Sequence, residues 1–224
     1  EDTKKYFDKL VNQERTDWGI YTANTDNPNV LKGKIKDLEE AMDYEFEIVP
    51  TYQHLLSGGS KIDFPTQSTI NVASGNGFNG KKVLQFSYQF TSNNNNVSSG
   101  NTTDCYTPMF DILRGEPQEY DFFDIRSQIY RSFELLAEGL KSYKEPVLFR
   151  LNNEMNTDWT SYCGMMTLLD TDIFQATWRV IYNIFEEEGV DNCIWIFNPF
   201  DNSFPYSSWG EDLCYYPGID YVQA

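Results

Sequence analysis

The segment Val147–Trp159, VLFRLNNEMNTDW, decides the fold. Its apolar first half predicts a buried strand that ends at Asn153, and the run stops at a single carboxylate, Glu154. The reactive groups of α/β barrels lie at the carboxyl ends of their strands, so Glu154 stands where such chemistry occurs. The amides of Asn153 and Asn156 can bind hydroxyl groups, and the ring of Trp159 can pack on a pyranose face. Together these residues indicate a site that handles sugars.

Strand and helix patterns alternate along the rest of the chain. Apolar runs bounded by turn residues predict strands at 18–22, 45–54, 82–90, 147–153 and 192–199. Apolar residues at helical spacing predict helices at 3–13, 30–43, 66–74, 109–114, 121–144 and 172–188. Apolar strands that alternate with helices favour parallel pairing and an α/β fold.

The fold class that we expect is a (β/α)8 TIM barrel, in one domain over residues 1–224. An open doubly wound sheet is the alternative, but the glycine-rich phosphate loop that such folds carry after the first strand is absent from this sequence. A closed barrel has eight strands and about 250 residues. Since only about five strands are visible, we expect a barrel truncated before strands six to eight, and a longer parent chain.

Length and charge limit the classes of partner. A chain of 224 residues is long enough for one domain with a sizeable core. The aromatic content of 16% is high; a core rich in Phe and Tyr explains most of it, and the remainder suits a carbohydrate-binding groove. The net charge is −17 and no basic stripe is present, so nucleic acid and anionic membranes are poor partners. A neutral polysaccharide or oligosaccharide is compatible with this charge.

Cysteine usage and targeting signals give weaker constraints. The four Cys allow three disulfide pairings, and free buried thiols are an equal alternative. No Cys or His spacing indicates a metal site, and we expect neither a metal nor another cofactor. No segment is long and apolar enough for a membrane span, and no signal peptide is visible. The opening Glu1–Lys5 fits the start of a trimmed product, so we expect a protein that is secreted or held at the cell surface. We also expect a monomer.

Glu154 is suited to general acid/base work on a glycosidic bond. Retaining glycosidases use two carboxyl groups, one as acid/base and one as nucleophile. The alternative is a surface glutamate at the start of a loop. Arg150 alternates onto the same side of the strand as Asn152 and Glu154. Because a charge inside a barrel needs a partner, we expect Arg150 to pair with a carboxylate.

His54 is the only histidine and ends the predicted strand at 45–54. It either contacts substrate or is a solvated loop residue. Nucleophilic chemistry at serine or cysteine usually needs a histidine base, and no motif here supports it. The aromatic residues that are candidates for stacking on sugar are Trp159, Tyr162, Trp195, Phe197 and Trp209. Trp159 is the best of them because it follows the acid, whereas Trp195 is equally suited to the core.

Several segments resemble glycoside hydrolase family 26, the β-mannanase family of the (β/α)8 clan A. Residues 149–159 resemble the family's Arg-Pro-x-His-Glu-Met-Asn-Gly-x-Trp signature after strand four. Residues 174–199 resemble its helix four and strand five, where a Trp-Arg pair precedes a Trp-x-x-x-Pro-Asn segment. Residues 216–222 resemble the lead-in to strand six, and 112–116 the stretch before the third helix.

The resemblance implies a role for each matching residue. Glu154 would be the acid/base, Arg150 the active-site arginine and Trp159 a subsite aromatic. Asn153 stands where the family usually has His; other families of the clan have Asn-Glu there, with the Asn on a sugar 2-hydroxyl. The nucleophilic glutamate of the family would lie at the end of strand seven, beyond Ala224.

We therefore expect a retaining endo-β-glycanase that acts on β-mannan or, next in order, on mixed-linkage β-glucan or β-xylan. One alternative is a non-catalytic glycan-binding protein or an inactive barrel fragment that lacks the nucleophile. Another is an unrelated α/β protein in which Glu154 is structural.

Overall fold

The computed structural model describes residues 2–22, 28–55, 71–75, 77–90, 107–121 and 123–224. Its helices are α1 (Asp2–Asn12), α2 (Pro28–Met42), α4 (Met109–Leu113), α5 (Ile125–Tyr143) and α6 (Asp172–Glu187). Its strands are β1 (Ile48–His54), β2 (Val83–Gln89), β3 (Val147–Leu151) and β4 (Cys193–Trp195). Short 3-10 turns, η3 (Gly164–Thr167), η4 (Asp212–Tyr215) and η5 (Ile219–Tyr221), follow β3 and β4 along the chain.

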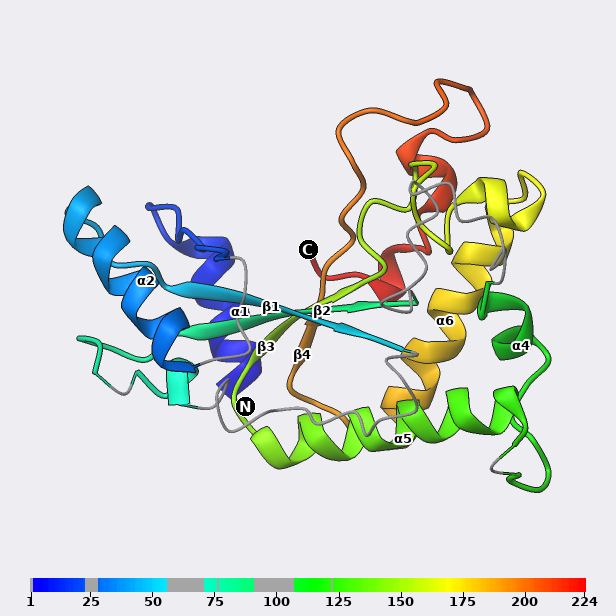
Figure 1. The fold of residues 1–224 in the computed structure, drawn as a ribbon, viewed down its shortest axis with the longest axis horizontal. Coiled ribbons are helices and arrows are strands. Elements are labelled where there is room, and N and C mark those ends of the chain that lie inside the picture. Colours follow the sequence, from blue (N-terminus) through cyan, green and yellow to red (C-terminus); the bar gives the residue numbers. More distant parts are fainter. Residues whose placement is uncertain (1, 23–27, 56–70, 76, 91–106, 122) are drawn as a thin grey trace.

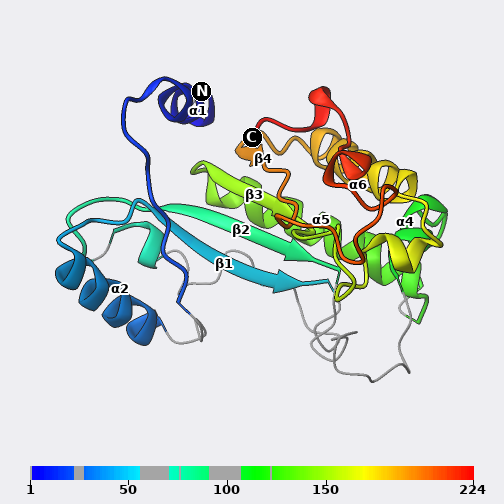
Figure 2. The ribbon, with the colours of Figure 1, turned by 90° about the horizontal axis from the view of Figure 1, so that it is seen from above.

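The four strands form one parallel sheet in the order β1-β2-β3-β4, with their carboxyl ends at the same edge (Figures 1 and 2). Each strand lies beside the next in the chain, with helical segments between them, as the alternating pattern predicts. In Figure 1, α2 lies toward one end of the molecule and α4, α5 and α6 toward the other. This arrangement places the segments that follow β3 and β4 at one edge, where α/β barrels carry their sites.

One face of the sheet packs against the helices and forms the core. The side chains of Phe86, Phe149 and Trp195 lie on this face and are at most 3% exposed. They meet the buried stripes of α5 and α6, including Phe133 and Trp178. The opposite face, which we call the site face, carries Tyr52, Ser87 and Arg150, which share one register row. Alternation along each strand therefore separates apolar core residues from polar residues of the site.

Helix bounds agree with the sequence because their end signals are local. Asp124 caps α5, since its Oδ2 accepts a hydrogen bond from the Ser127 N–H at 2.9 Å. Gly189 follows α6 with φ 73°, as expected of a glycine that ends a helix. Of the helix expected at 66–74, only residues 71–73 lie within the described residues, and these are helical.

The prediction of a strand at 18–22 is wrong. Among the described residues this segment forms only a single parallel bridge, from Gly19 to Ile48. The Trp18 carbonyl accepts the N–H groups of both Glu47 and Ile48, at 3.1 and 3.3 Å, and Ile20 donates to the Ile48 carbonyl at 3.0 Å. Glycine in the middle of a short run gives little side chain to pack, so pairing with β1 does not extend further.

The last two residues run beside β4. The Ala224 N–H donates to the Trp195 carbonyl at 3.1 Å, and the Phe197 N–H donates to the Ala224 carbonyl at 2.9 Å. This is where the sequence predicts the start of a sixth strand. Across the described ranges, no helix has the length and apolar character needed to cross a bilayer.

Candidate active site

The backbone turns sharply where β3 ends, and this turn presents Glu154. The strand expected at 147–153 ends at Leu151, because Asn152 and Glu154 both take left-handed conformations, with φ 47° and 61°. Asn152 is buried, and its Oδ1 accepts the Phe90 N–H at 3.0 Å. The Glu154 N–H donates to the Asn198 carbonyl at 2.8 Å. The turn is thus held from both neighbouring strands.

The Glu154 carboxylate is half-buried and is held by an indole. The Trp159 Nε1–H donates to Glu154 Oε2 at 3.3 Å. The Trp159 ring is itself packed edge-on against Phe200, with centroids 5.1 Å apart, and against Phe204 at 5.8 Å. One carboxylate oxygen is therefore positioned by a rigid aromatic group, and the other stays available for proton transfer.

Arg150 lies on β3, on the site face, four residues before Glu154. Its Nε donates to Ser87 Oγ at 2.7 Å, its Nη1 to Asn198 Oδ1 at 2.8 Å and its Nη2 to the Tyr52 hydroxyl. The expected pairing with a carboxylate is not seen among the described residues, where the partners of Arg150 are neutral. These neutral partners come from β1, β2 and the segment after β4, and they hold the guanidinium on the site face.

Asn153 belongs to a small network of side chains. It is 5% exposed, and its Oδ1 accepts a hydrogen bond from Gln89 Nε2 at 2.9 Å. Tyr162, which is fully buried, donates its hydroxyl proton to the Asn153 carbonyl at 2.8 Å and accepts from Gln89 at 3.2 Å. Burial raises the pKa of Tyr162, and the Glu154 charge raises it further, so the phenol stays protonated. Because Tyr162 is buried, the prediction that its ring stacks on sugar is wrong.

Asn156 holds a loop. It is 2% exposed; its Nδ2 donates to the Phe200 carbonyl at 2.9 Å and its Oδ1 accepts the Phe200 N–H at 2.7 Å. The Asn156 carbonyl also accepts the Phe204 N–H at 2.9 Å. The amide that was expected to contact substrate thus fixes residues 200–204, which carry the rings around Trp159.

The other two expected contacts lie on different parts of the sheet. His54 ends β1 beside Gln89, at the same edge as Glu154. Burial lowers its pKa below the usual value of 6.5. Trp195 is 3% exposed and packs between Phe149 and Trp178, at centroid distances of 4.6 and 5.6 Å. The structure therefore places Trp195 in the core, which is the alternative that its sequence pattern left open.

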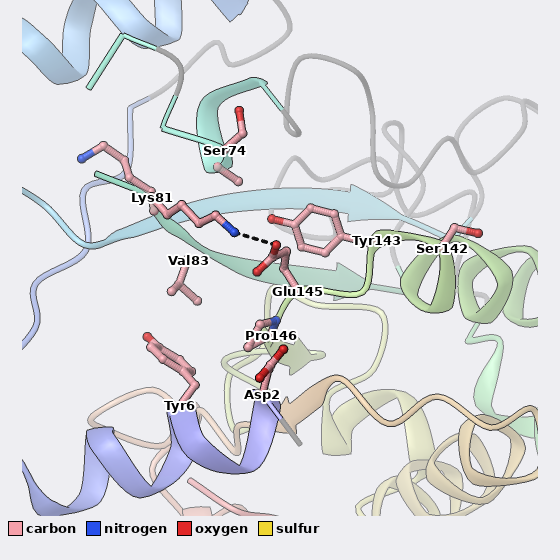
Figure 3. A pocket seen from close by; sticks show the side chains of 11 residues that line it. Asp2, Tyr6, Ser74, Lys81, Val83, Ser142, Tyr143, Glu145 and Pro146 are labelled. Atoms are coloured by element: carbon pink, nitrogen blue, oxygen red, sulfur yellow. Dashed lines mark hydrogen bonds and ion pairs between the residues drawn. The ribbon is translucent and has the colours of Figure 1, made fainter. Parts of the chain in front are cut away.

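A pocket of about 850 Å³ lies at the opposite, amino-terminal edge of the sheet (Figure 3). Tyr6 and Asp2 of α1 face Val83 and Pro146 across it, and Lys81 forms an ion pair with Glu145 at 2.8 Å on its rim. None of the residues around Glu154 lines it. Since barrels carry their chemistry at the carboxyl edge, we place the candidate site at Glu154 and not in this pocket.

The described residues contain no group of three His, Cys, Asp or Glu side chains placed to hold a metal ion. The three cysteines within them, Cys163, Cys193 and Cys214, are free thiols. Cys105 lies outside the described residues. Burial raises the pKa of both Cys163 and Cys193, so neither thiol is activated as a nucleophile.

Residues that the sequence analysis did not single out complete the site: Tyr52, Ser87, Gln89, Asn198, Phe200 and Phe204. A signal exists for Gln89, since it is a polar residue between Tyr88 and Phe90 at the end of a strand, which alternation turns to the site face. Nothing in the local sequence marks Phe200 or Phe204 as neighbours of Trp159.

Comparisons with known proteins agree with this architecture. The family model for Glycosyl hydrolase family 26 matches residues 78–224. Endoglucanase H of Acetivibrio thermocellus is 32% identical over 115 residues, which make up 50% of this chain and 12% of that protein. The chain therefore spans only a small part of this curated relative.

Two solved structures share the fold. Bacillus subtilis mannanase man26 matches with a TM-score of 0.65 and 19% identity, over 98% of this chain and 67% of that one. A β-mannanase from a symbiotic protist of the termite Reticulitermes speratus, complexed with gluco-manno-oligosaccharide, matches with a TM-score of 0.68 and 16% identity, over 99% and 67%. The expected barrel fold is thereby confirmed, over about two thirds of the length of these structures.

Proposed function

The chain belongs to glycosyl hydrolase family 26, and from this premise we propose that it carries the acid/base half of a retaining β-glycanase active site. The observation that carries the proposal is the Glu154 carboxylate at the end of β3, bound through one oxygen by the Trp159 indole. Arg150 stands four residues before it on the site face with only neutral hydrogen-bond partners within the described residues.

In the proposed reaction, Glu154 protonates the glycosidic oxygen as the bond to the sugar breaks. In the second step it removes a proton from the incoming water, which then hydrolyses the glycosyl-enzyme. This route needs a second carboxyl group as nucleophile. The family resemblance puts that group at the end of a seventh strand, which the described residues do not include.

The substrate that we propose first is β-mannan. In support, the two solved structures above are named as mannanases. Mixed-linkage β-glucan comes next because the curated relative is named Endoglucanase H, followed by β-xylan. The rings of Trp159, Phe200 and Phe204, together with the amides near Glu154, suit a neutral sugar polymer.

The acid/base role is tested with Glu154→Gln in the full-length protein. Release of reducing ends from mannan, β-glucan and xylan should fall by about 100-fold or more, as removal of a general acid predicts. Glu211→Gln is the matched control, because it removes an exposed carboxylate on the loop after β4 and should leave turnover unchanged. With Glu154→Ala, an activated aryl leaving group departs without an acid, and azide should restore turnover because it attacks the glycosyl-enzyme without a general base.

Equal turnover by Glu154→Gln and the parent would show that Glu154 is not the acid. Binding of an oligosaccharide without any hydrolysis by the parent would favour the glycan-binding alternative. We also propose that the protein acts outside the cell, because its polymeric substrate is found there. Immunoblots of culture medium and cell fractions test this, and signal confined to the cell interior would contradict it.

A further inference from the structure

Three side chains beside Glu154 form a hydrogen-bond relay with only one possible direction. It begins at Tyr162, whose hydroxyl lies 2.8 Å from the backbone carbonyl of Asn153. A carbonyl oxygen can only accept, so Tyr162 must donate its single proton there. Burial raises the pKa of Tyr162, which keeps that proton in place at neutral pH.

The hydrogen bond that Tyr162 donates also fixes the orientation of the Gln89 amide. With its proton committed, the phenol oxygen can only accept, and Gln89 is its neighbour at 3.2 Å. The nitrogen of the Gln89 amide must therefore face Tyr162, which resolves the usual ambiguity between amide oxygen and nitrogen. The same nitrogen lies 2.9 Å from the Asn153 side chain and donates its second proton there.

The relay ends at Asn153 and sets the face that its amide presents. Since Gln89 donates, the Asn153 atom that meets it must be Oδ1. Nδ2 has no hydrogen-bond partner within the described ranges, and it is not one of their buried unpaired polar atoms, so it keeps access to solvent. Asn153 therefore offers donors and not an acceptor next to Glu154.

We propose that Gln89 is a specificity-determining positioning residue, which turns the Asn153 amide so that its N–H group binds a hydroxyl oxygen of the sugar beside Glu154. This inference rests on the proposed function for its ligand. It predicts that the oxygen of the bound hydroxyl accepts a hydrogen bond from Asn153 Nδ2, and that the hydroxyl donates its own proton to another group. A glycan whose hydroxyl oxygen is missing or turned away at this position is rejected, because Nδ2 would lose water without gaining a partner.

The inference is tested by changing the direction of the relay without changing its shape. In Gln89→Glu the carboxylate can only accept, so the Asn153 amide turns over and presents Oδ1 to the ligand. Gln89→Met keeps a similar side-chain volume but favours neither orientation of the Asn153 amide. Asn153→Asp still accepts from Gln89 but has no N–H to offer. Gln118→Glu, on the exposed surface, controls for the added charge.

The readout is the affinity for mannohexaose, cellohexaose and xylohexaose, measured by calorimetry on the full-length protein with Glu154→Gln in the parent and in every variant, so that the ligand is not hydrolysed. For the hexaose that the parent binds best, Gln89→Glu and Asn153→Asp should each weaken binding about tenfold, the equivalent of about 1.4 kcal/mol. Gln89→Met should lose less than Gln89→Glu, and the Gln118→Glu control should bind like the parent. Equal affinity of Gln89→Glu and the parent, or equal losses for the Met and Glu variants, would overturn the proposal.

A second measurement needs no ligand. In ¹⁵N-resolved NMR spectra, the side-chain N–H signals of Gln89 should exchange slowly with solvent, and Tyr162→Phe should speed this exchange. If Asn153 N–H signals are the protected ones, the relay runs the other way and the proposal is wrong. If no hexaose binds the parent, the proposed function and the sugar contact both fail, while the NMR result still decides the direction of the relay.

Discussion

Replacing Asn156 with alanine should destabilise the protein by releasing the loop that packs on Trp159. The Asn156 side chain is 2% exposed and forms two hydrogen bonds with the Phe200 backbone, of 2.9 and 2.7 Å. Each backbone group left without a partner costs about 1–3 kcal/mol when it stays buried. Phe200 is half-buried, so water relieves part of this cost, and we expect a loss of about 2–3 kcal/mol in the free energy of unfolding.

The assay is equilibrium unfolding in urea, followed by circular dichroism and by tryptophan fluorescence. The midpoint should fall while the slope with urea stays the same, because the surface exposed on unfolding does not change. Asn202→Ala is the matched control. Asn202 lies on the same loop but is exposed, so its change should stay within about 0.5 kcal/mol.

A loss of less than about 1 kcal/mol for Asn156→Ala, or a loss no larger than that of the control, would show that the loop does not depend on Asn156. Unchanged stability together with weaker oligosaccharide binding would instead restore Asn156 as a direct substrate contact.

Gly164→Ala should lose about 1–3 kcal/mol of stability in thermal unfolding, because the added Cβ would lie 2.9 Å from the Trp209 ring and still closer to the Tyr215 hydroxyl oxygen. Gly33→Ala is the comparison: nothing lies within 4 Å of its added Cβ, so it should gain about 0.5–1 kcal/mol. His54, the only histidine, should titrate below 6.5 by NMR. Its neutral form is favoured in the folded state, so stability should be lost as pH falls from about 6.5 through the folded pKa, and His54→Gln should remove this slope; a midpoint at or above 6.5 would refute it. Trp159→Phe keeps the ring but removes the N–H to Glu154, and should lower kcat about tenfold for a lost hydrogen bond of about 1.5 kcal/mol to a charged group; equal rates would contradict it.

The helices and the parallel sheet could be predicted because their signals are local. The apolar stripe of α5 and its Asp124 cap lie within a single segment, and the predicted range 121–144 contains the observed Ile125–Tyr143. The position of Glu154 also follows from one segment, since a buried strand must deliver its last residues to the carboxyl edge of a parallel sheet.

The partners within the site could not be predicted in the same way. Arg150 finds its three acceptors 63, 48 and 98 residues away in the chain, and a charged residue has no local signal that separates neutral partners from a carboxylate. Likewise, the sequence does not distinguish Asn153 from Asn156, although one amide keeps a free N–H and the other holds a loop. The Trp18–Thr22 run has strand-like composition, but pairing depends on its neighbour as much as on itself.

The left-handed backbone of Glu154 has a consequence for selection experiments. A φ of 61° is unfavourable for a glutamate, whereas glycine adopts it freely and asparagine tolerates it. Glycine or asparagine at this position should therefore give a more stable protein. A library sorted for heat resistance alone should lose the carboxylate here, and one sorted for turnover should keep it. Other left-handed positions, such as Lys144 and Leu168, should change in both libraries, so the difference between the two would separate Glu154 from them.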